Sequence, residues 1–202
     1  VPNPWPRPTH GPGLKPYVTV GDAISDLPVL TNGQESEMMT YLSAPQSPYQ
    51  RILRVGSKTV ANHSAARLAA INIERLRHIP PGGSWRDIPF GLLPAGMKRA
   101  KRSDHTKRYG RLSWDGLAST VLTKCDPHWG AYFHPDQDRT ITVREAARLQ
   151  SFPDVFHFSG SRTEQYVQVG NAVPPLLGKH IAKAIIGSSA ARTNVAALAA
   201  AE

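Results

Sequence analysis

The chain of 202 residues holds a single cysteine, Cys125, so no disulfide can form within it. No apolar run approaches the roughly 18 residues that a membrane-spanning helix needs, and we expect no contact with a membrane. Acidic residues are also scarce, since 15 aspartates and glutamates face 24 lysines and arginines, for a net charge of +9. This imbalance favours a polyanionic partner, and nucleic acid is the commonest of these.

Glycine and proline are plentiful, at 16 and 18 residues, which predicts many turns and irregular connections. We predict an α+β fold with short strands, among them Leu117–Thr123, and one long helix over Ser64–Ile79 that ends at the following prolines. Residues 1–16 are rich in both residue types and indicate an extended segment. Residues 188–202, rich in alanine and serine, indicate a frayed tail.

A short helix is predicted after Thr142, because Glu145 lies three residues later, at the spacing of a capping box. Pro153 ends this helix, since the residue before a proline avoids the helical region. Arg144 and Arg148 are four residues apart and therefore share one face. The pattern alone favours a solvated arginine face.

A second pattern lies nearer the C-terminus. Residues Tyr166–Val169 are predicted as a strand, and Gly170 with Asn171 as a tight turn, because both residue types tolerate positive φ. The two prolines from Pro174 open a helix for which Gly187 is a natural C-terminal cap. Strand, turn and helix in this order bring bare backbone close to a ligand, although an ordinary connection has the same pattern.

Seven cations crowd the segment Lys98–Arg111, opposed by Asp104 alone. On a loop, this density favours contact with phosphate groups and binding that weakens as salt rises. A flexible, solvated surface loop is an equally good interpretation. A metal site is not favoured, because Cys125, His128 and His134 are irregularly spaced and no second pair of cysteines accompanies them.

The two C-terminal patterns resemble the last two motifs of the DNA (cytosine-5-) methyltransferases. Residues 139–154 resemble the family's Arg-Glu-(Ala/Cys)-Ala-Arg…Phe-Pro-Asp motif, and residues 168–173 are similar to its Gln-x-Gly-Asn-(Ala/Ser)-Val motif. The motifs occur in the family's order, and the resemblance extends over about residues 18–187. The scaffold positions of the first motif are Arg139, Arg144, Glu145 and Arg148.

The resemblance implies a division of the chain into four parts. Residues 1–28 would end the catalytic domain, 29–135 would form a target-recognition domain at the DNA major groove, 136–187 would return to the catalytic domain, and 188–202 would trail as a tail. The C-terminal helices would complete an α/β Rossmann-like methyltransferase domain. The implied partner is double-stranded DNA in a bacterial cytoplasm.

The resemblance also implies two groups of functional residues. The Gly-Asn turn would close one side of the S-adenosylmethionine site, with cofactor contacts at Gly170, Asn171, Ala172 and Val173. The family's Thr-Leu or Thr-Ile pair is matched by Thr120 and Val121. Contacts with DNA are expected at Arg99, Lys101, Arg102, Arg111, Thr120 and Val121.

Four other motifs of the family are absent: its Phe-x-Gly-x-Gly cofactor loop, Pro-Cys nucleophile, Glu-Asn-Val glutamate and Gln-x-Arg-x-Arg segment. We therefore predict no catalytic residue in this chain and no methyl transfer by it alone. A catalytic half is expected in cis or as a separate subunit, and the start at Val1 favours the first. The alternatives are a stand-alone, non-catalytic DNA-binding module and a relative that acts on RNA.

Overall fold

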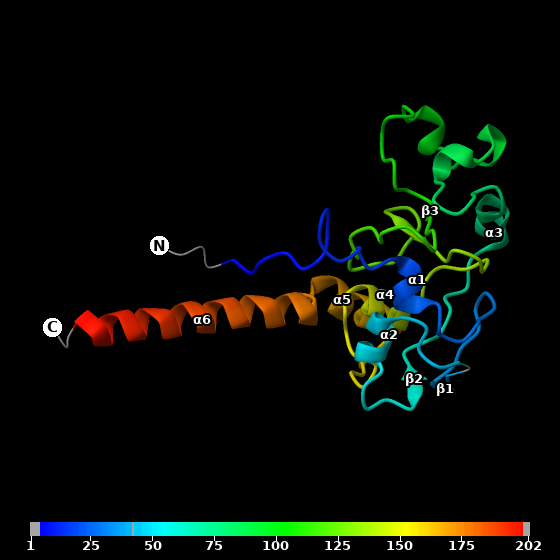
Figure 1. Ribbon diagram of the computed structural model, residues 1–202. Helices are drawn as coiled ribbons and strands as arrows, with labels where there is room; N and C mark the ends of the chain where they lie inside the picture. The colour runs from blue at the N-terminus through cyan, green and yellow to red at the C-terminus, as the bar shows by residue number, and fades with distance from the viewer. Residues whose placement is uncertain (1–4, 42, 200–202) are drawn as a thin grey trace. The chain divides into compact units, whose positions relative to one another are not determined.

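The computed structural model describes residues 5–41 and 43–199 (Figure 1). Contacts divide the chain into a larger unit, Val18–Ala172, and a smaller one that joins Val1–Tyr17 to Val173–Glu202. The described residues mix helices with short strands, in agreement with the predicted α+β class. None of the described helices is both long and apolar enough to cross a membrane.

The helices of the larger unit are short. They are α1 (Val20–Ile24), α2 (Pro48–Leu53), α3 (Ala70–Arg77), α4 (Val143–Leu149) and α5 (Arg162–Asn171), together with the 3₁₀ turns η1 (Trp85–Asp87), η2 (Phe90–Leu92) and η3 (Met97–Arg99). Figure 1 shows α1, α2, α4 and α5 close together, and α4 contacts both α1 and α5. The smaller unit contains one long helix, α6 (Pro175–Ala199).

Local side chains start several of these helices. The capping box predicted at the start of α4 is confirmed: Glu145 N donates to Thr142 Oγ1 (3.1 Å), and Thr142 N donates to Glu145 Oε2 (2.6 Å). Each such box satisfies two backbone N–H groups that would otherwise lack a partner. The same arrangement begins α1, α2 and α5, at Thr19, Ser47 and Ser161.

The strands form two small sheets. β1 (Met38–Thr40) pairs antiparallel with β2 (Thr59–Ala61), and Met39 lies opposite Val60. β3 (Gly110–Arg111) pairs parallel with β4 (Ala131–Phe133) across a register shift. Sheets of two strands bury little by themselves, so helices and loops supply most of the core.

Neighbouring residues of β4 point into two different apolar clusters. Tyr132 packs into the main cluster with residues of α1, α4 and α5, whereas Phe133 packs into a second cluster. Successive side chains of a strand face opposite sides, which explains the two directions. The second cluster contains Leu76, Ile79, Trp85, Ile88, Met97, Tyr109 and Phe133. β4 therefore contacts both the main cluster around α4 and the second cluster, which supports residues 98–111. Residues 98–111 are called the basic segment below.

The strand predicted over Tyr166–Val169 is wrong, because these residues lie in α5. The Ser161 cap starts a helix, and its buried residues Tyr166 and Val169 are three apart, as they would be on one helical face. Gly170 and Asn171 form the last turn of this helix, and φ is positive at neither. The short apolar run fits both the two-residue period of a strand and the 3.6-residue period of a helix. The cap at Ser161 favours the helix.

The helix predicted over Ser64–Ile79 begins late, at Ala70. Leu68 N donates to Asn32 Oδ1 (2.8 Å), and the Asn32 amide donates back to Leu68 O (3.1 Å). These bonds take backbone groups that a longer helix would use, so α3 has only eight residues.

The strand predicted over Leu117–Thr123 is also absent from this described segment. The Tyr132 hydroxyl accepts a hydrogen bond from Leu122 N (3.1 Å) and donates one to Thr120 O (3.0 Å). A side chain thus satisfies backbone groups that a neighbouring strand would otherwise bind.

The last helix is longer than predicted. Gly187 does not end it, and α6 continues to Ala199, so the frayed tail expected from residue 188 is wrong as far as that residue. Alanine has the highest helix propensity, which favours this continuation. Residues 200–202 of the predicted tail lie outside the described residues.

Gly170 allows α5 to pass close to the backbone of residues 122–123. A Cβ added there would lie 2.5 Å from Leu122 C and Thr123 N, which are backbone atoms that cannot turn aside. We predict that Gly170→Ala lowers the unfolding free energy by about 1–3 kcal/mol, as overpacking typically does. Thermal unfolding followed by circular dichroism measures the change.

The matched control is Gly178→Ala on α6, where an added Cβ meets nothing within 4 Å. That substitution should be neutral or slightly stabilising, because alanine restricts the unfolded chain. An unchanged Tm for Gly170→Ala would contradict the close approach.

Candidate functional site

The arginines of the first C-terminal motif are buried. Arg144 and Arg148 of α4 are 0% exposed, and so is Arg139, which precedes the helix. The solvated arginine face favoured by the sequence pattern is therefore wrong. A guanidinium group is very costly to bury without partners, and each of these arginines binds carboxylates or carbonyl oxygens of the same unit.

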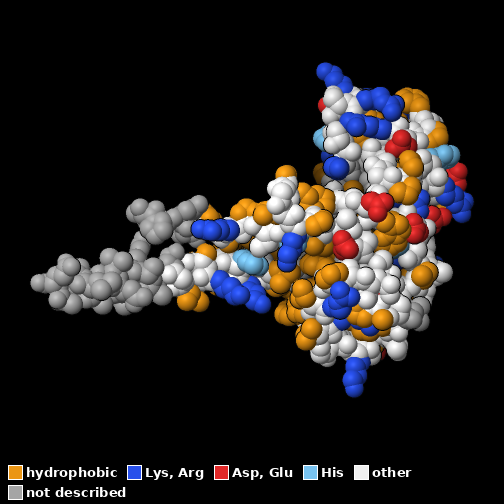
Figure 2. Space-filling view, viewed as in Figure 1, with side chains coloured by type: hydrophobic (Ala, Val, Ile, Leu, Met, Phe, Trp, Pro, Cys, Tyr) orange, Lys and Arg blue, Asp and Glu red, His pale blue; other side chains and the backbone are white. Residues whose placement is uncertain are grey.

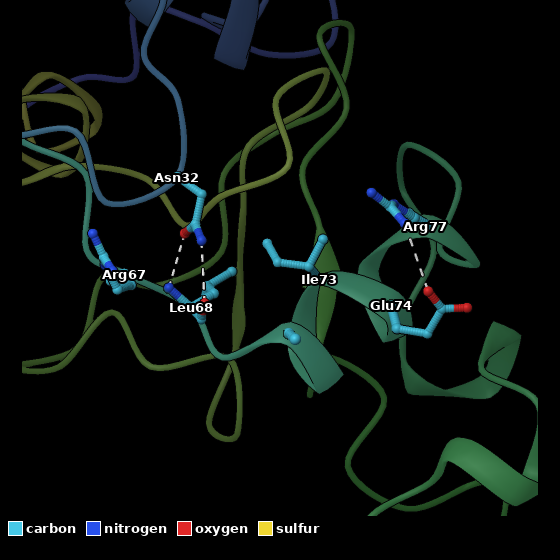
Figure 3. Close-up of a pocket in the computed structure, with 7 residues that line it drawn as sticks. Asn32, Arg67, Leu68, Ile73, Glu74 and Arg77 are labelled. Carbon is cyan, nitrogen blue, oxygen red and sulfur yellow. Dashed lines mark hydrogen bonds and ion pairs between the residues drawn. The ribbon is translucent and has the colours of Figure 1, made fainter.

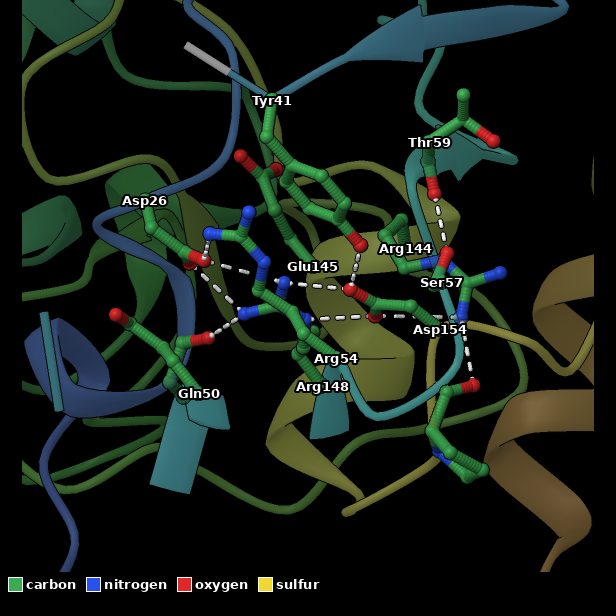
Figure 4. A network of polar contacts seen from close by, with 12 residues as sticks. Asp26, Tyr41, Gln50, Arg54, Ser57, Thr59, Arg144, Glu145, Arg148 and Asp154 are labelled. Atoms are coloured by element: carbon green, nitrogen blue, oxygen red, sulfur yellow. Dashed lines mark hydrogen bonds and ion pairs between the residues drawn. The ribbon is translucent and has the colours of Figure 1, made fainter. Parts of the chain in front are cut away.

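Arg148 binds two carboxylates from distant parts of the chain (Figure 4). Its Nε and Nη2 donate to the two oxygens of Asp154 (2.7 and 2.6 Å), and its Nη1 donates to Asp26 Oδ1 (2.8 Å). Asp26 also accepts from Arg54 Nη1 (2.9 Å), and Asp154 accepts from the Tyr41 hydroxyl. One guanidinium thus connects the segment after α1, helix α4 and the segment that follows it.

These contacts change the acidity of the groups involved. Burial disfavours the charge of Arg148, but hydrogen bonds and the negative charges of Asp154 and Asp26 outweigh it and raise the pKa. Burial, together with the hydrogen bond to Asp154, raises the pKa of Tyr41 to about 12. Arg148 therefore stays charged and the Tyr41 hydroxyl stays protonated, as their contacts with the carboxylates require.

Arg139 and Glu145 form a second buried pair. Arg139 Nη1 and Nη2 donate to the two oxygens of Glu145 (2.8 and 2.7 Å), a bidentate geometry that strengthens such contacts. Burial opposes ionisation of Glu145, yet the charge of Arg139 holds the pKa of this carboxyl well below its ordinary value. The capping carboxylate of α4 is therefore ionised and doubly fixed.

Arg144 binds mainly backbone oxygens, and its Nη1 also lies 3.8 Å from Asp154 Oδ1. Its Nε donates to Ala61 O (2.9 Å) at the end of β2, and its Nη2 donates to Phe156 O (2.6 Å). The Arg144 backbone N donates to Asn62 O (2.9 Å). Helix α4 is thereby connected to residues 61–62 and to the loop that follows it.

Two buried histidines lie close to Glu145. His63 Nδ1 is 2.9 Å from Thr142 Oγ1, and His134 Nε2 is 3.7 Å from Glu145 Oε1. The backbone N–H groups of Asp136 and Gln137 donate to His134 Nδ1 (3.1 and 3.0 Å), so this nitrogen must keep its lone pair. Burial lowers the pKa of His134 from 6.5 to about 4. The contact with Glu145 is thus made by a neutral ring, not an ion pair.

The basic segment carries exposed positive charge. Lys98, Arg99, Lys101, Arg102 and Lys107 are all exposed. Figure 2 shows lysine and arginine side chains gathered at the top of the view, over the green part of the chain in Figure 1. The segment's acidic residue, Asp104, caps the backbone N of Lys101 (3.2 Å). Positive charge here faces solvent with little local compensation.

Two of the residues predicted to contact DNA, Arg111 and Val121, are largely buried, unlike the exposed cations of the basic segment. The Arg111 side chain is 12% exposed and donates to the backbone oxygens of Ile79 (3.2 Å) and Pro135 (2.8 Å). Val121 is 7% exposed and belongs to the main cluster, while its neighbour Thr120 is exposed. Packing thus uses Arg111 and Val121 inside the fold, and this geometry argues against direct contact with DNA.

The predicted cofactor contacts lie at the end of α5 and just beyond it. Asn171 is exposed, and Gly170 and Ala172 are half-buried. Val173, the first residue of the C-terminal part of the smaller unit, is 63% exposed.

The cysteine and histidines considered for a metal do not form a site. Cys125 is buried, and burial raises the pKa of its thiol. His128 binds the Tyr109 hydroxyl (2.6 Å) and Asp126 (2.8 Å). Among the residues that the structure describes, no three histidine, cysteine or acidic side chains are placed to hold a metal ion.

A depression of about 600 Å³ lies beside α3 (Figure 3). Asn32 on its wall exchanges two hydrogen bonds with the backbone of Leu68, and Arg77 lies 3.7 Å from Glu74. The charged side chains that line it are exposed, and Glu74 and Arg77 pair with each other. This depression is a surface feature without buried polar groups directed into it.

Several residues of the buried network carry no recognisable sequence signal. Asp26, Tyr41, Arg54 and His63 lie far from the motif and in turn-rich stretches. An aspartate just before a proline-ended turn, as at Asp26, is common in solvated loops. No local pattern around the motif indicates an acidic partner so distant in the sequence.

Comparisons with known proteins agree on one relationship. Residues 33–187 match the family described as C-5 cytosine-specific DNA methylase. The chain is 34% identical over 223 residues to the Type II methyltransferase M.AgeI of Thalassovita gelatinovora, across 87% of this chain and 52% of that protein. It is 38% identical over 189 residues to DNA (cytosine-5)-methyltransferase 1A of Oryza sativa subsp. japonica, across 83% of this chain and 12% of that protein.

A solved structure shows the fold relationship. It is described as a DNA modification methyltransferase encoded within a prophage (E. coli), and matches with a TM-score of 0.60 at 24% identity. The match covers 84% of this chain and 47% of that chain. The chain thus spans about half of these two bacterial proteins, and a smaller share of the plant protein.

We predict that Arg148→Met lowers the unfolding free energy by about 3–5 kcal/mol, the typical loss when one partner of a buried ion pair is removed. Asp154 would lose its bidentate partner, and Asp26 would keep Arg54 alone. Urea unfolding measures the loss. The control is Arg77→Met, because Arg77 is 63% exposed and its ion pairs are long, at 3.7 Å. Similar shifts in both variants would show that the buried network contributes little.

His134 should make the protein less stable in mild acid. Between pH 6.5 and about 4 the unfolded state binds a proton on this side chain that the folded state does not bind. The unfolding free energy therefore falls as pH drops through this window. His134→Gln should flatten the pH dependence in part, since burial also lowers the pKa of His63. Denaturant unfolding across the window tests this, with His78→Gln as the exposed control; equal slopes would contradict it.

Proposed function

The chain belongs to the C-5 cytosine-specific DNA methylase family, and we propose that it is the C-terminal part of a DNA cytosine-5 methyltransferase. In this proposal the whole enzyme transfers a methyl group from S-adenosylmethionine to C5 of cytosine in duplex DNA. This part recognises DNA and closes one side of the cofactor site. A catalytic half, in cis or as a separate subunit, completes the enzyme.

The buried arginine network is the observation that carries the proposal. Arg148 binds Asp26, which precedes the proposed recognition region of residues 29–135, and Asp154, which follows it. Arg144 binds Ala61 within that region. Residues 136–187 would therefore hold the recognition region in a fixed orientation, as an enzyme must when it presents DNA to a distant reactive centre.

Recognition of DNA is supported by the exposed cations of the basic segment. Four of them, Lys98, Arg99, Lys101 and Arg102, lie within five residues and are exposed. Cations placed in this way bind phosphates and release counterions, which makes affinity strongly dependent on salt. We assign direct contact with DNA to Arg99, Lys101, Arg102 and Thr120, and a supporting role to Arg111.

The end of α5 fits one wall of a cofactor site. Gly170 is needed for the close approach to Leu122–Thr123, while the side chains of Asn171 and Val173 face solvent and remain available. When bound, S-adenosylmethionine supplies the electrophilic methyl group. The role of Gly170, Asn171, Ala172 and Val173 in this proposal is to hold and orient the cofactor.

This chain does not supply the nucleophile. Attack on C6 of cytosine requires a thiolate, and the one cysteine, Cys125, is buried with a raised thiol pKa. The proposal therefore assigns the covalent step to the catalytic half. The exposed apolar side chains of α6, among them Leu177 (48%) and Ile186 (68%), support contact of this helix with that half.

A stand-alone DNA-binding module is the second candidate. The exposed basic segment favours it, since binding needs no catalytic partner. A module of that kind has no use for cofactor contacts at Gly170–Val173. An RNA substrate is less favoured, because the recognition region is long.

The test is reconstitution with a catalytic half that carries the four motifs missing from this chain. We expect tritium from labelled S-adenosylmethionine to enter duplex DNA only when both halves are present. Substituting the Pro-Cys cysteine of the catalytic half should abolish transfer, whereas Cys125→Ser in this chain should retain it. Transfer RNA should not compete with the duplex.

Three results would contradict the proposal: transfer by this chain alone, loss of transfer in Cys125→Ser when that variant is folded, or no transfer by the two halves. Duplex binding without any transfer would favour the stand-alone module.

A further inference from the structure

Two aromatic side chains near the basic segment are exposed to solvent. Phe90 on η2 is 67% exposed, and Trp129, just before β4, is 59% exposed. Single exposed apolar residues are common on proteins. These two differ because each has a cation against its ring: Lys98 Nζ lies 5.5 Å from the Phe90 centroid, and the Arg108 guanidinium carbon lies 5.0 Å from the Trp129 ring.

A chain of contacts connects the two rings through Met97. Arg108, which lies over Trp129, also places Nη1 3.7 Å from Met97 Sδ. Met97 precedes Lys98 in η3, and Lys98 lies beside Phe90. A chain of contacts thus runs from one ring to the other across residues 97–108.

Residues of the second apolar cluster pack beneath the segments that carry the two rings. Met97 and Tyr109 are 5% and 0% exposed and belong to the second apolar cluster. The Tyr109 hydroxyl binds His128 (2.6 Å), the neighbour of Trp129, and Arg75 Nε binds Leu92 O (2.7 Å) at the end of η2. This packing and these hydrogen bonds therefore fix the segments from which the two rings project.

We infer that Phe90 and Trp129 contact nucleobases directly and supply a salt-independent part of DNA binding. Every base has an apolar face that stacks on an aromatic ring, and exposed aromatics among cations are the arrangement that single-stranded or unstacked bases bind. The cations over the two rings would meet the adjacent phosphates. This inference rests on the proposed recognition of DNA and adds two residues to its surface.

Salt separates the two kinds of contact. A cation that binds a phosphate contributes to the slope of log K against log salt, at about 0.9 per phosphate on duplex DNA. A ring that stacks on a base displaces no counterion, so its loss lowers affinity equally at all salt concentrations. Ring and cation variants therefore differ in the property that changes, not only in its size.

The experiment uses the 202-residue chain and a fluorescein-labelled duplex with single-stranded overhangs, which the chain itself enriches from a randomised pool. Anisotropy titrations at several salt concentrations compare Phe90→Leu, Trp129→Leu, the ring-retaining Phe90→Tyr and Trp129→Phe, and a double Lys98→Ala, Lys101→Ala variant. The aromatic control is Tyr17→Leu, because Tyr17 is also exposed (54%) and lies in the N-terminal segment.

Each leucine variant should bind about 5- to 100-fold more weakly with an unchanged salt slope, the loss that one stacked base represents. The ring-retaining variants should keep more affinity than the leucine variants, and Tyr17→Leu should bind like the unsubstituted chain. The double lysine variant should reduce the slope by about one for each cation. Circular dichroism of each variant establishes that it is folded.

Full affinity of both leucine variants would overturn this inference and leave recognition of DNA by this chain intact. A reduced salt slope in the leucine variants would also overturn it, since the rings would then act by holding the cations. Failure of the unsubstituted chain to enrich or bind any duplex would overturn the proposed recognition of DNA, and the inference with it.

Discussion

The larger unit depends on one guanidinium group, that of Arg148, shared between the carboxylates of Asp26 and Asp154. All three residues are at most 2% exposed. Taking three charges out of water is costly, and only near-ideal geometry with additional partners offsets that cost. Arg54 and Tyr41 provide those partners, since Arg54 donates to Asp26 and the Tyr41 hydroxyl donates to Asp154. The loss of any member would leave a buried charge without its partner. The network also joins the two ends of the proposed recognition region.

The positively charged side chains of this unit have two different roles, one around α4 and one in the basic segment. Around α4, arginines lie among carboxylates and carbonyl oxygens, and their charge is neutralised within a few ångströms. In the basic segment, cations lie at the surface with Asp104 as their acidic neighbour in the sequence. The net charge of +9 would therefore attract a partner mainly through the exposed cations of the basic segment. A rigid interior and a charged exterior are what presentation of DNA to a separate catalytic half would require.

Local rules predicted the starts of helices and failed where distant groups intervened. The capping box of Thr142 and Glu145 needs only residues three apart, so the sequence was sufficient. The late start of α3 depends on Asn32, 36 residues from Leu68, and the missing strand before Cys125 depends on the Tyr132 hydroxyl. A propensity over a short window carries no information about such partners. The strand predicted in place of α5 has a different cause, because the capping box of Ser161 and Glu164 is local.

The sequence by itself determined the family, through two motifs in a fixed order, and it determined where α4 begins, whereas the helix ends at Leu149, before the predicted stop at Pro153. The sequence also identified Arg139, Arg144, Glu145 and Arg148 as a group. Only the tertiary structure decided that these arginines are buried, because the partner of Arg148 lies 122 residues away at Asp26. Residues four apart share a helical face in any fold, but whether that face meets water or a carboxylate depends on how the whole chain packs.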